Sequence, residues 1–188
     1  MPTRYTRGCM PTLRKATFAD ISALNALISR SARGLSAADY SPRQIEGALR
    51  GAFGVDSQLL SDGTYFAVED LREIVGCGGW SFRSTLFGGD ARAGRDSSIL
   101  DPKTQAAKIR AFFVDPRHAR RGIGSLLLEH CENQARARGY SVVELMATLP
   151  GARLYRARGY SAGAPLRFDV GSGESIEFIP MRKALVAP

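Results

Sequence analysis

The chain has 188 residues, 44% of them hydrophobic, and a formal net charge of +8 at pH 7. This length predicts one domain covering residues 1–188, and the apolar content excludes a disordered chain. The 20 glycines follow no three-residue period, and no apolar run reaches the ~18 residues of a membrane span. Collagen-like and membrane-spanning chains are therefore excluded.

The first half of the chain predicts a strand, two helices and a β-hairpin, in that order. Each helix begins at a capping residue, Thr17 in the first and Ser41 in the second, where Pro42 takes the first helical position. The irregular segment 83–106 after the hairpin is typical of a functional loop. The predicted ranges are about 13–16 for the strand, 17–31 and 41–49 for the helices, and 65–69 and 74–82 for the hairpin strands.

The second half of the chain alternates between strands and helices. Glycines end both helices, Gly139 the first and Gly159 the second. The predicted strands are about 109–114, 142–146, 166–170 and 175–181, and the predicted helices are about 122–138 and 152–158. The whole order is strand–helix–helix–strand–strand–strand–helix–strand–helix–strand–strand, which predicts a single mixed α/β domain.

Cysteine and histidine usage bears on the cellular compartment and on metal binding. The cysteines, Cys9, Cys77 and Cys131, are widely spaced, which predicts reduced thiols in a cytoplasmic protein. Residues 1–10 hold no apolar segment typical of a secretory signal. There is no Cys/His cluster, so no metal site is predicted. A covalent route through Cys77 has no histidine base marked by its sequence context.

The segment that joins the central strand to the longest helix is the most informative for function. The strand ends at Val114, and a basic loop with Arg120 and Arg121 follows. The helix then begins through Gly122 and Gly124. A first helical turn has N–H groups without intrahelical partners and the positive end of the helix dipole, and glycines let a ligand approach it. The segment therefore predicts an anion site suited to a pyrophosphate, without the P-loop or dinucleotide fingerprint.

Two motifs separated by a predicted strand resemble those of one known family. Residues 114–125, which end in Arg-Gly-Ile-Gly-Ser, resemble motif A of the GCN5-related N-acetyltransferase superfamily, with Ala119 where the family has Gln or Arg. Residues 152–160, Ala-Arg-Leu-Tyr-Arg-Ala-Arg-Gly-Tyr, are similar to its motif B. The resemblance covers nearly the whole chain. It implies the family's α/β fold, a mostly antiparallel sheet with flanking helices.

The resemblance also implies roles for individual residues. Backbone N–H groups at the helix start would hold the pyrophosphate of acetyl-CoA. Tyr155 would give a proton to the departing thiolate; its alternative role is to pack its helix onto the sheet. Glu144 is the nearest strand carboxylate for a general base, against an ordinary ion-paired role or a water chain in its place. The implied acetyl-CoA-binding residues are Phe112, Val114, Arg120, Arg121, Gly122, Ile123, Gly124 and Ser125.

The resulting hypothesis is an acetyl-CoA-dependent N-acetyltransferase that moves the acetyl group directly to a primary amine in a ternary complex. One alternative is a non-catalytic acyl-CoA-binding regulator. Another is a basic nucleic-acid-binding domain, which the clustering of arginines at a glycine-bearing helix start disfavours.

The acceptor would be the amine of a small molecule or peptide, and the sequence does not define it further. It would lie over residues 65–82, between segments 32–40 and 83–106. No membrane partner is predicted, and a homodimer is compatible with the sequence. Three aromatic residues either line the acceptor pocket or pack beneath the long loop: Trp80, Phe82 and Phe87.

Overall fold

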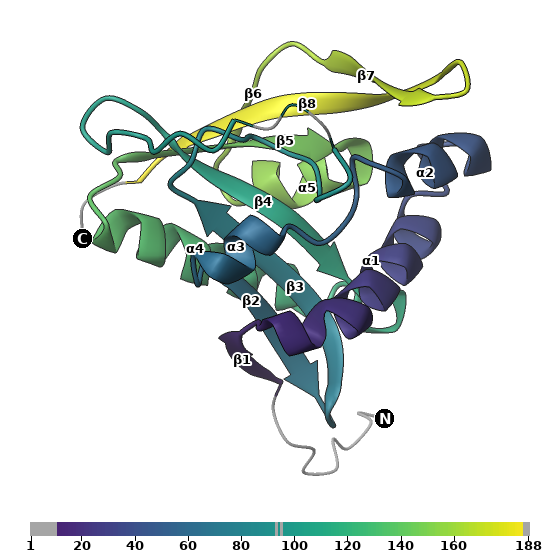
Figure 1. The fold of residues 1–188 in the computed structure, drawn as a ribbon, viewed down its shortest axis with the longest axis horizontal. Helices are drawn as coiled ribbons and strands as arrows, with labels where there is room; N and C mark the ends of the chain where they lie inside the picture. Colours follow the sequence, from purple (N-terminus) through teal and green to yellow (C-terminus); the bar gives the residue numbers. More distant parts are fainter. Residues whose placement is uncertain (1–10, 93, 95, 186–188) are drawn as a thin grey trace, which may run out of the picture.

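The computed structural model describes residues 11–92, 94 and 96–185, and it shows one open sheet flanked by helices (Figure 1). Within these residues the sheet has eight strands in the order β1-β2-β3-β4-β5-β8-β6, and β7 pairs with β8 outside this path. All pairs are antiparallel except β4 with β5. The strands are β1 Thr12–Lys15, β2 Tyr65–Asp70, β3 Glu73–Ser81, β4 Ala107–Val114, β5 Val142–Thr148, β6 Ser161–Ala162, β7 Leu166–Gly171 and β8 Glu174–Ala184.

Helices cover both faces of the sheet (Figure 1). α4 and α5 pack into the core on one face, and α1, α2 and α3 pack into a second core on the opposite face. No helix in the described part of the chain is long and apolar enough to cross a membrane. The helices are α1 Ile21–Leu35, α2 Pro42–Leu49, α3 Ser57–Ser61, α4 Ile123–Ala137 and α5 Leu149–Ala157, with 3-10 turns at Phe18–Asp20 and Pro116–His118.

The mixed α/β class and the order of the main elements are confirmed, with two short additions. The sequence did not predict α3 and β6, because a helix of 5 residues and a strand of 2 residues show no hydrophobic period. The first predicted helix opens as a 3-10 turn after Thr17, and α1 then continues to Leu35, beyond its predicted end. α5 begins at Leu149 rather than near residue 152, because Thr148 caps it and Pro150 is accepted in the first turn.

A bulge in β4 opens the sheet between β4 and β5. β4 pairs with β5 only through Ala107 and Lys108. Further along, Ala111 has a φ of +57°, and it lies with Phe112 opposite the single residue Gly78 of β3. A Cβ at Gly78 would lie 2.7 Å from the Phe112 ring, so this position requires glycine. The bulge separates the two central strands where the candidate site begins.

Candidate active site

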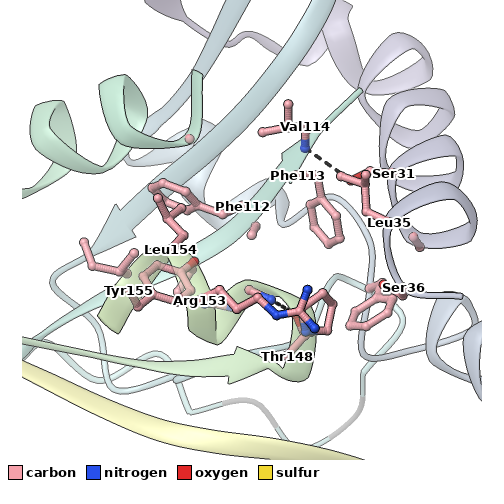
Figure 2. Close-up of a pocket in the computed structure, with 18 of the residues that line it drawn as sticks. Ser31, Leu35, Ser36, Phe112, Phe113, Val114, Thr148, Arg153, Leu154 and Tyr155 are labelled. Carbon is pink, nitrogen blue, oxygen red and sulfur yellow. Dashed lines mark hydrogen bonds between the residues drawn. The ribbon is translucent and has the colours of Figure 1, made fainter. Parts of the chain in front are cut away.

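A single cavity of about 810 Å³ passes through the opening between β4 and β5. Phe112 and Val114 line it from the α4 face of the sheet, and Phe113 and Met146 line it from the α1 face. One wall in Figure 2 holds Phe112, Leu154 and Tyr155, and the opposite wall holds Phe113, Leu35 and Ser36. Because the cavity reaches both faces, two ligands can enter from opposite sides and meet inside the sheet.

The N-terminus of α4 forms one end of the cavity. Arg120, Gly122, Ile123, Gly124 and Ser125 line it, as the sequence predicts. Two backbone positions take left-handed conformations before the helix, with φ of +63° at Arg120 and +85° at Gly122. The helix then exposes first-turn N–H groups that have no intrahelical partner. This geometry suits an anion.

A buried carboxylate fixes the loop before α4. Asp115 is 1% exposed and accepts hydrogen bonds from the backbone N–H of Arg117 at 2.9 Å and from Arg30 Nε at 3.1 Å. Side-chain hydrogen bonds from Arg117 hold the pKa of Asp115 well below its usual range. Arg30 belongs to α1, so this carboxylate joins α1 to the loop. No motif in the sequence assigned a role to Asp115.

Tyr155 lies on α5 and lines the cavity with 8% of its surface exposed. Its ring makes edge contacts with Phe112 at 6.3 Å and with Tyr160 at 5.6 Å between ring centroids. Burial raises the pKa of Tyr155 above its ordinary value of 10.0. The hydroxyl therefore stays protonated at neutral pH and can donate a hydrogen bond.

Two predicted site residues lie outside the cavity. Glu144 forms an ion pair with Lys108, its partner in the β4–β5 ladder, and it is not part of the cavity lining. Arg121 is exposed at the start of α4 and does not line the cavity either. The structure thus brings Tyr155 together with the other predicted residues, which are Phe112, Val114, Arg120, Gly122, Ile123, Gly124 and Ser125.

The aromatic residues considered for the acceptor pocket divide between the two faces. Trp80 and Phe82 are buried in the core beneath α4, where Trp80 also contacts Tyr140 at 6.2 Å between ring centroids. Of these three aromatic residues, only Phe87 lines the cavity, and it comes from the long segment 83–106. Sequence reasoning missed most of the apolar lining on the α1 face. Those residues are Leu35, Phe53, Phe113, Met146 and Phe178.

A buried ion pair fixes the floor of the cavity on the α1 face. Arg110 of β4 lines the cavity, and its Nη1 lies 2.6 Å from Oδ2 of Asp56, with both side chains at most 2% exposed. Arg110 also donates a hydrogen bond of 2.7 Å to the carbonyl of Gly88. Arg110 therefore connects β4 to the start of α3 through Asp56 and to segment 83–106 through Gly88.

The mouth of the cavity is bordered by α5 and the loop after α1. Arg153 extends from α5 across the cavity (Figure 2), and its Nη2 lies 3.5 Å from Asp39 Oδ1. Tyr40 donates a 2.7 Å hydrogen bond to the carbonyl of Glu177 and accepts one of 2.9 Å from the N–H of Leu149. These contacts hold the loop against α5 and β8.

Covalent and metal chemistry find little support at the described residues. Cys77 is fully buried, and burial raises the pKa of its thiol to about 12, so it is not a ready nucleophile. Cys131 is buried as well, and Cys9 lies outside the described residues. Within the described ranges, no group of three or more His, Cys, Asp or Glu side chains is placed to hold a metal ion.

Solved structures with a similar fold include N-acetyltransferases. A GCN5-related N-acetyltransferase from Rhodopseudomonas palustris is 20% identical, with a TM-score of 0.69 over 96% of this chain and 99% of the other. PaiA N-acetyltransferase from Thermoplasma acidophilum, in complex with coenzyme A, is 16% identical, with a TM-score of 0.64 over 94% and 99%. The protein yncA from Salmonella typhimurium, with its cofactor acetyl-CoA, is 16% identical, with a TM-score of 0.60 over 95% of both chains.

Sequence comparison identifies the family. Residues 33–160 match the acetyltransferase (GNAT) family, so the chain belongs to this family. A search of curated proteins finds no significant match. The resemblance predicted from the two motifs is confirmed, and the structural likenesses add agreement at the level of the fold.

Proposed function

We propose that the protein is an acetyl-CoA-dependent N-acetyltransferase that passes the acetyl group directly to a primary amine in a ternary complex. The observation that carries this proposal is the single cavity through the sheet, which joins the N-terminus of α4 to Tyr155 and opens on both faces. A donor on one face and an acceptor on the other would meet at the opening. Family membership and the two similar folds determined with CoA or acetyl-CoA support the choice of donor.

The residues at the α4 end of the cavity fit the pyrophosphate of acetyl-CoA. First-turn N–H groups and the helix dipole attract an anion, and Arg120 adds a positive charge. Among the described residues, no Asp or Glu lines the cavity to repel it. Phe112, Val114 and Leu154 offer an apolar wall for the pantetheine arm. Acetyl-CoA would supply an acetyl group activated as a thioester.

Tyr155 is the residue proposed to assist bond cleavage. In the transfer, the amine nitrogen bonds to the carbonyl carbon, the C–S bond breaks, and sulfur leaves with the electron pair. The nitrogen loses one proton and the sulfur gains one, which gives an amide and a thiol. The Tyr155 hydroxyl donates the proton to sulfur and regains one through water. Its raised pKa keeps the hydroxyl protonated at neutral pH.

The amine proton must leave without a carboxylate in the cavity. Glu144 is held by Lys108 outside the lining, so it is not placed to take this proton. Water would carry this proton to bulk solvent instead, with backbone carbonyls at the opening orienting the water by hydrogen bonds. The positive charge of Arg120 in the lining would also lower the pKa of a bound amine, which increases its neutral fraction.

The proposal is tested by binding and turnover measured on the same preparation. Acetyl-CoA should raise the melting temperature in a concentration-dependent way, because a ligand of the native state stabilises it by mass action. Thiol release with a panel of primary amines should then exceed the rate without an amine. Binding without release for any amine would favour the non-catalytic regulator. Absence of binding would contradict both.

Replacement of Gly124 by valine should abolish the stabilisation by acetyl-CoA. The new side chain would enter the anion site, and its Cβ would already lie 3.0 Å from Leu154 Cδ2. Isothermal calorimetry measures the effect, and circular dichroism shows whether the variant is folded. Gly51→Val is the matched control, because a Cβ at Gly51 meets nothing within 4 Å. Unchanged affinity in a folded Gly124→Val variant would place the pyrophosphate elsewhere.

The two neighbouring arginines should differ in their effect on CoA affinity. Arg120→Ala removes a charge from the cavity lining, whereas Arg121→Ala removes one from an exposed position outside it. We expect the larger loss of affinity for Arg120→Ala, and a loss that shrinks as salt screens the charge. Calorimetric titration at low and high ionic strength measures both. Equal losses in the two variants would indicate a general charge effect rather than a local contact.

A further inference from the structure

We infer that the acceptor is a small primary amine with an apolar substituent, best an aromatic one, and no second cationic group. This inference rests on the proposed function and adds the substrate class to it. Three observations carry it: the side chains of the acceptor end, the hydrogen-bonded segment that covers part of that end, and the distribution of charge around it.

The acceptor end of the cavity, on the α1 face, is apolar and largely aromatic. Phe53 contacts Phe113 at 5.8 Å and Phe178 at 6.5 Å between ring centroids, and Phe87 contacts Phe178 at 5.0 Å. These rings form a continuous surface that matches a flat apolar group by edge contacts. We call this part of the cavity the aromatic chamber, and its residues are Leu35, Phe53, Phe87, Phe113, Met146 and Phe178.

The segment that carries Phe87 is fastened over the aromatic chamber. The N–H of Gly89 bonds to the carbonyl of Gly51 at 3.3 Å, and the N–H of Asp90 bonds to the carbonyl of Val55 at 3.0 Å. The Asp90 carboxylate accepts a hydrogen bond of 3.0 Å from the N–H of Ser57, at the start of α3. The fastened segment favours a small substituent that ends inside the chamber over a polymer that passes through it.

The charges around the cavity disfavour a second ammonium group. Arg110, Arg120 and Arg153 line it, and none of the described lining residues is Asp or Glu. The charge of Arg110 is matched by Asp56 behind it, at 2.6 Å. That of Arg153 is matched by Asp39 at the mouth, at 3.5 Å. A diamine or polyamine would therefore bring its distal ammonium out of water into a lining whose described residues include no carboxylate, and the nearby carboxylates already pair with arginines.

Aromatic rings can also attract cations, but the guanidinium of Arg92 already lies over the face of Phe87 at the edge of the aromatic chamber. Arg92 Cζ lies 4.0 Å from the centroid of Phe87 and 5.4 Å from that of Phe168. A second cation on the same cluster would meet this positive charge. The aromatic chamber is therefore suited to a neutral ring or alkyl group rather than to an ammonium group.

Matched amines test the inference on the whole protein. Hexylamine and 1,5-diaminopentane have the same length, but hexylamine ends in a methyl group where the diamine ends in an ammonium group. 2-Phenylethylamine carries an aromatic ring as its apolar substituent. We expect kcat/KM to be on the order of 100-fold higher for 2-phenylethylamine than for the diamine, with hexylamine between them. The acetylated products are measured by mass spectrometry. Calorimetric binding of each amine to the CoA-loaded protein should follow the same order.

A substitution in the chamber should reverse this preference. Met146→Glu places a carboxylate among the rings, so kcat/KM for 1,5-diaminopentane should rise relative to hexylamine by about 10-fold or more. Met146→Gln has nearly the same shape without the charge, and it should keep the original order. Melting temperatures confirm that both variants are folded.

The outcomes separate this inference from the function on which it rests. If acetyl-CoA does not bind, the proposed function fails, and the inference fails with it. If acetyl-CoA binds but the diamine equals or exceeds hexylamine in binding and turnover, only the substrate class is overturned. The same holds if a peptide such as Phe-Ala-Ala is acetylated more efficiently than 2-phenylethylamine, or if none of the amines binds the CoA-loaded protein.

Discussion

Tyr155→Phe should lower kcat and kcat/KM together, by about 10²–10⁴-fold, the usual contribution of general acid catalysis. The variant keeps the ring that packs against Phe112 and removes only the hydroxyl. A hydroxyl that stabilises the departing thiolate acts mainly in the transition state, so the affinity for acetyl-CoA should change little. Steady-state kinetics with a productive amine measure the loss, and calorimetry with CoA measures the affinity.

Tyr160→Phe is the matched control for the loss of a hydroxyl. The Tyr160 ring contacts that of Tyr155, but its hydroxyl donates to Glu132 Oε1 at 2.9 Å, and the residue does not line the cavity. Its removal should lower stability because it takes a partner from a buried carboxylate, while kcat stays near that of the wild type. Activity of Tyr155→Phe within about threefold of the wild type would leave that residue a packing role alone, since acid catalysis contributes far more.

Asp56→Ala should give the largest loss of stability. Removal of one partner leaves the buried guanidinium of Arg110 without its carboxylate, which costs about 3–5 kcal/mol in comparable buried pairs. The substitution also removes the cap of α3, where Asp56 accepts a hydrogen bond of 3.1 Å from the N–H of Gln58. Urea denaturation should show a midpoint lower by roughly 2 M for an m-value on the order of 2 kcal/mol/M.

Two further variants measure how much of the stability lost in Asp56→Ala results from the buried charge. Asp56→Asn keeps an acceptor for the α3 cap and removes only the charge, so its loss should be smaller than that of Asp56→Ala. Glu46→Ala breaks an exposed ion pair with Arg33 and should change the urea midpoint little. A small effect of Asp56→Ala would show that Arg110 is stabilised mainly by its other contacts.

The cavity lining at the proposed donor end could be predicted because its signals are local in the sequence. Gly122 and Gly124 open a helix one short basic loop after a strand, so a short stretch of sequence specifies the proposed anion site. Tyr155 follows from the second motif of the family, and the structure places it in the same cavity. The family itself was predictable because its two motifs lie one on each side of a single predicted strand.

The acceptor end could not be predicted, because its residues come from segments far apart in the chain. Leu35 is the last residue of α1 and Phe178 lies in β8, and neither belongs to a local motif. The pairing of Glu144 with Lys108 depends on the register between two parallel strands, which a single sequence does not reveal. The buried pair of Asp56 and Arg110 likewise joins residues that no local pattern connects.

The difference in construction between the two ends of the cavity bears on how such a protein diverges. At the start of α4, the groups offered to a ligand belong largely to the backbone, which most substitutions leave in place. The aromatic chamber is built from side chains on separate segments, so one substitution reshapes one wall and leaves the others. Selection for a new amine can therefore act on positions such as Leu35, Phe87 or Met146 one at a time, while the fold and the donor end persist.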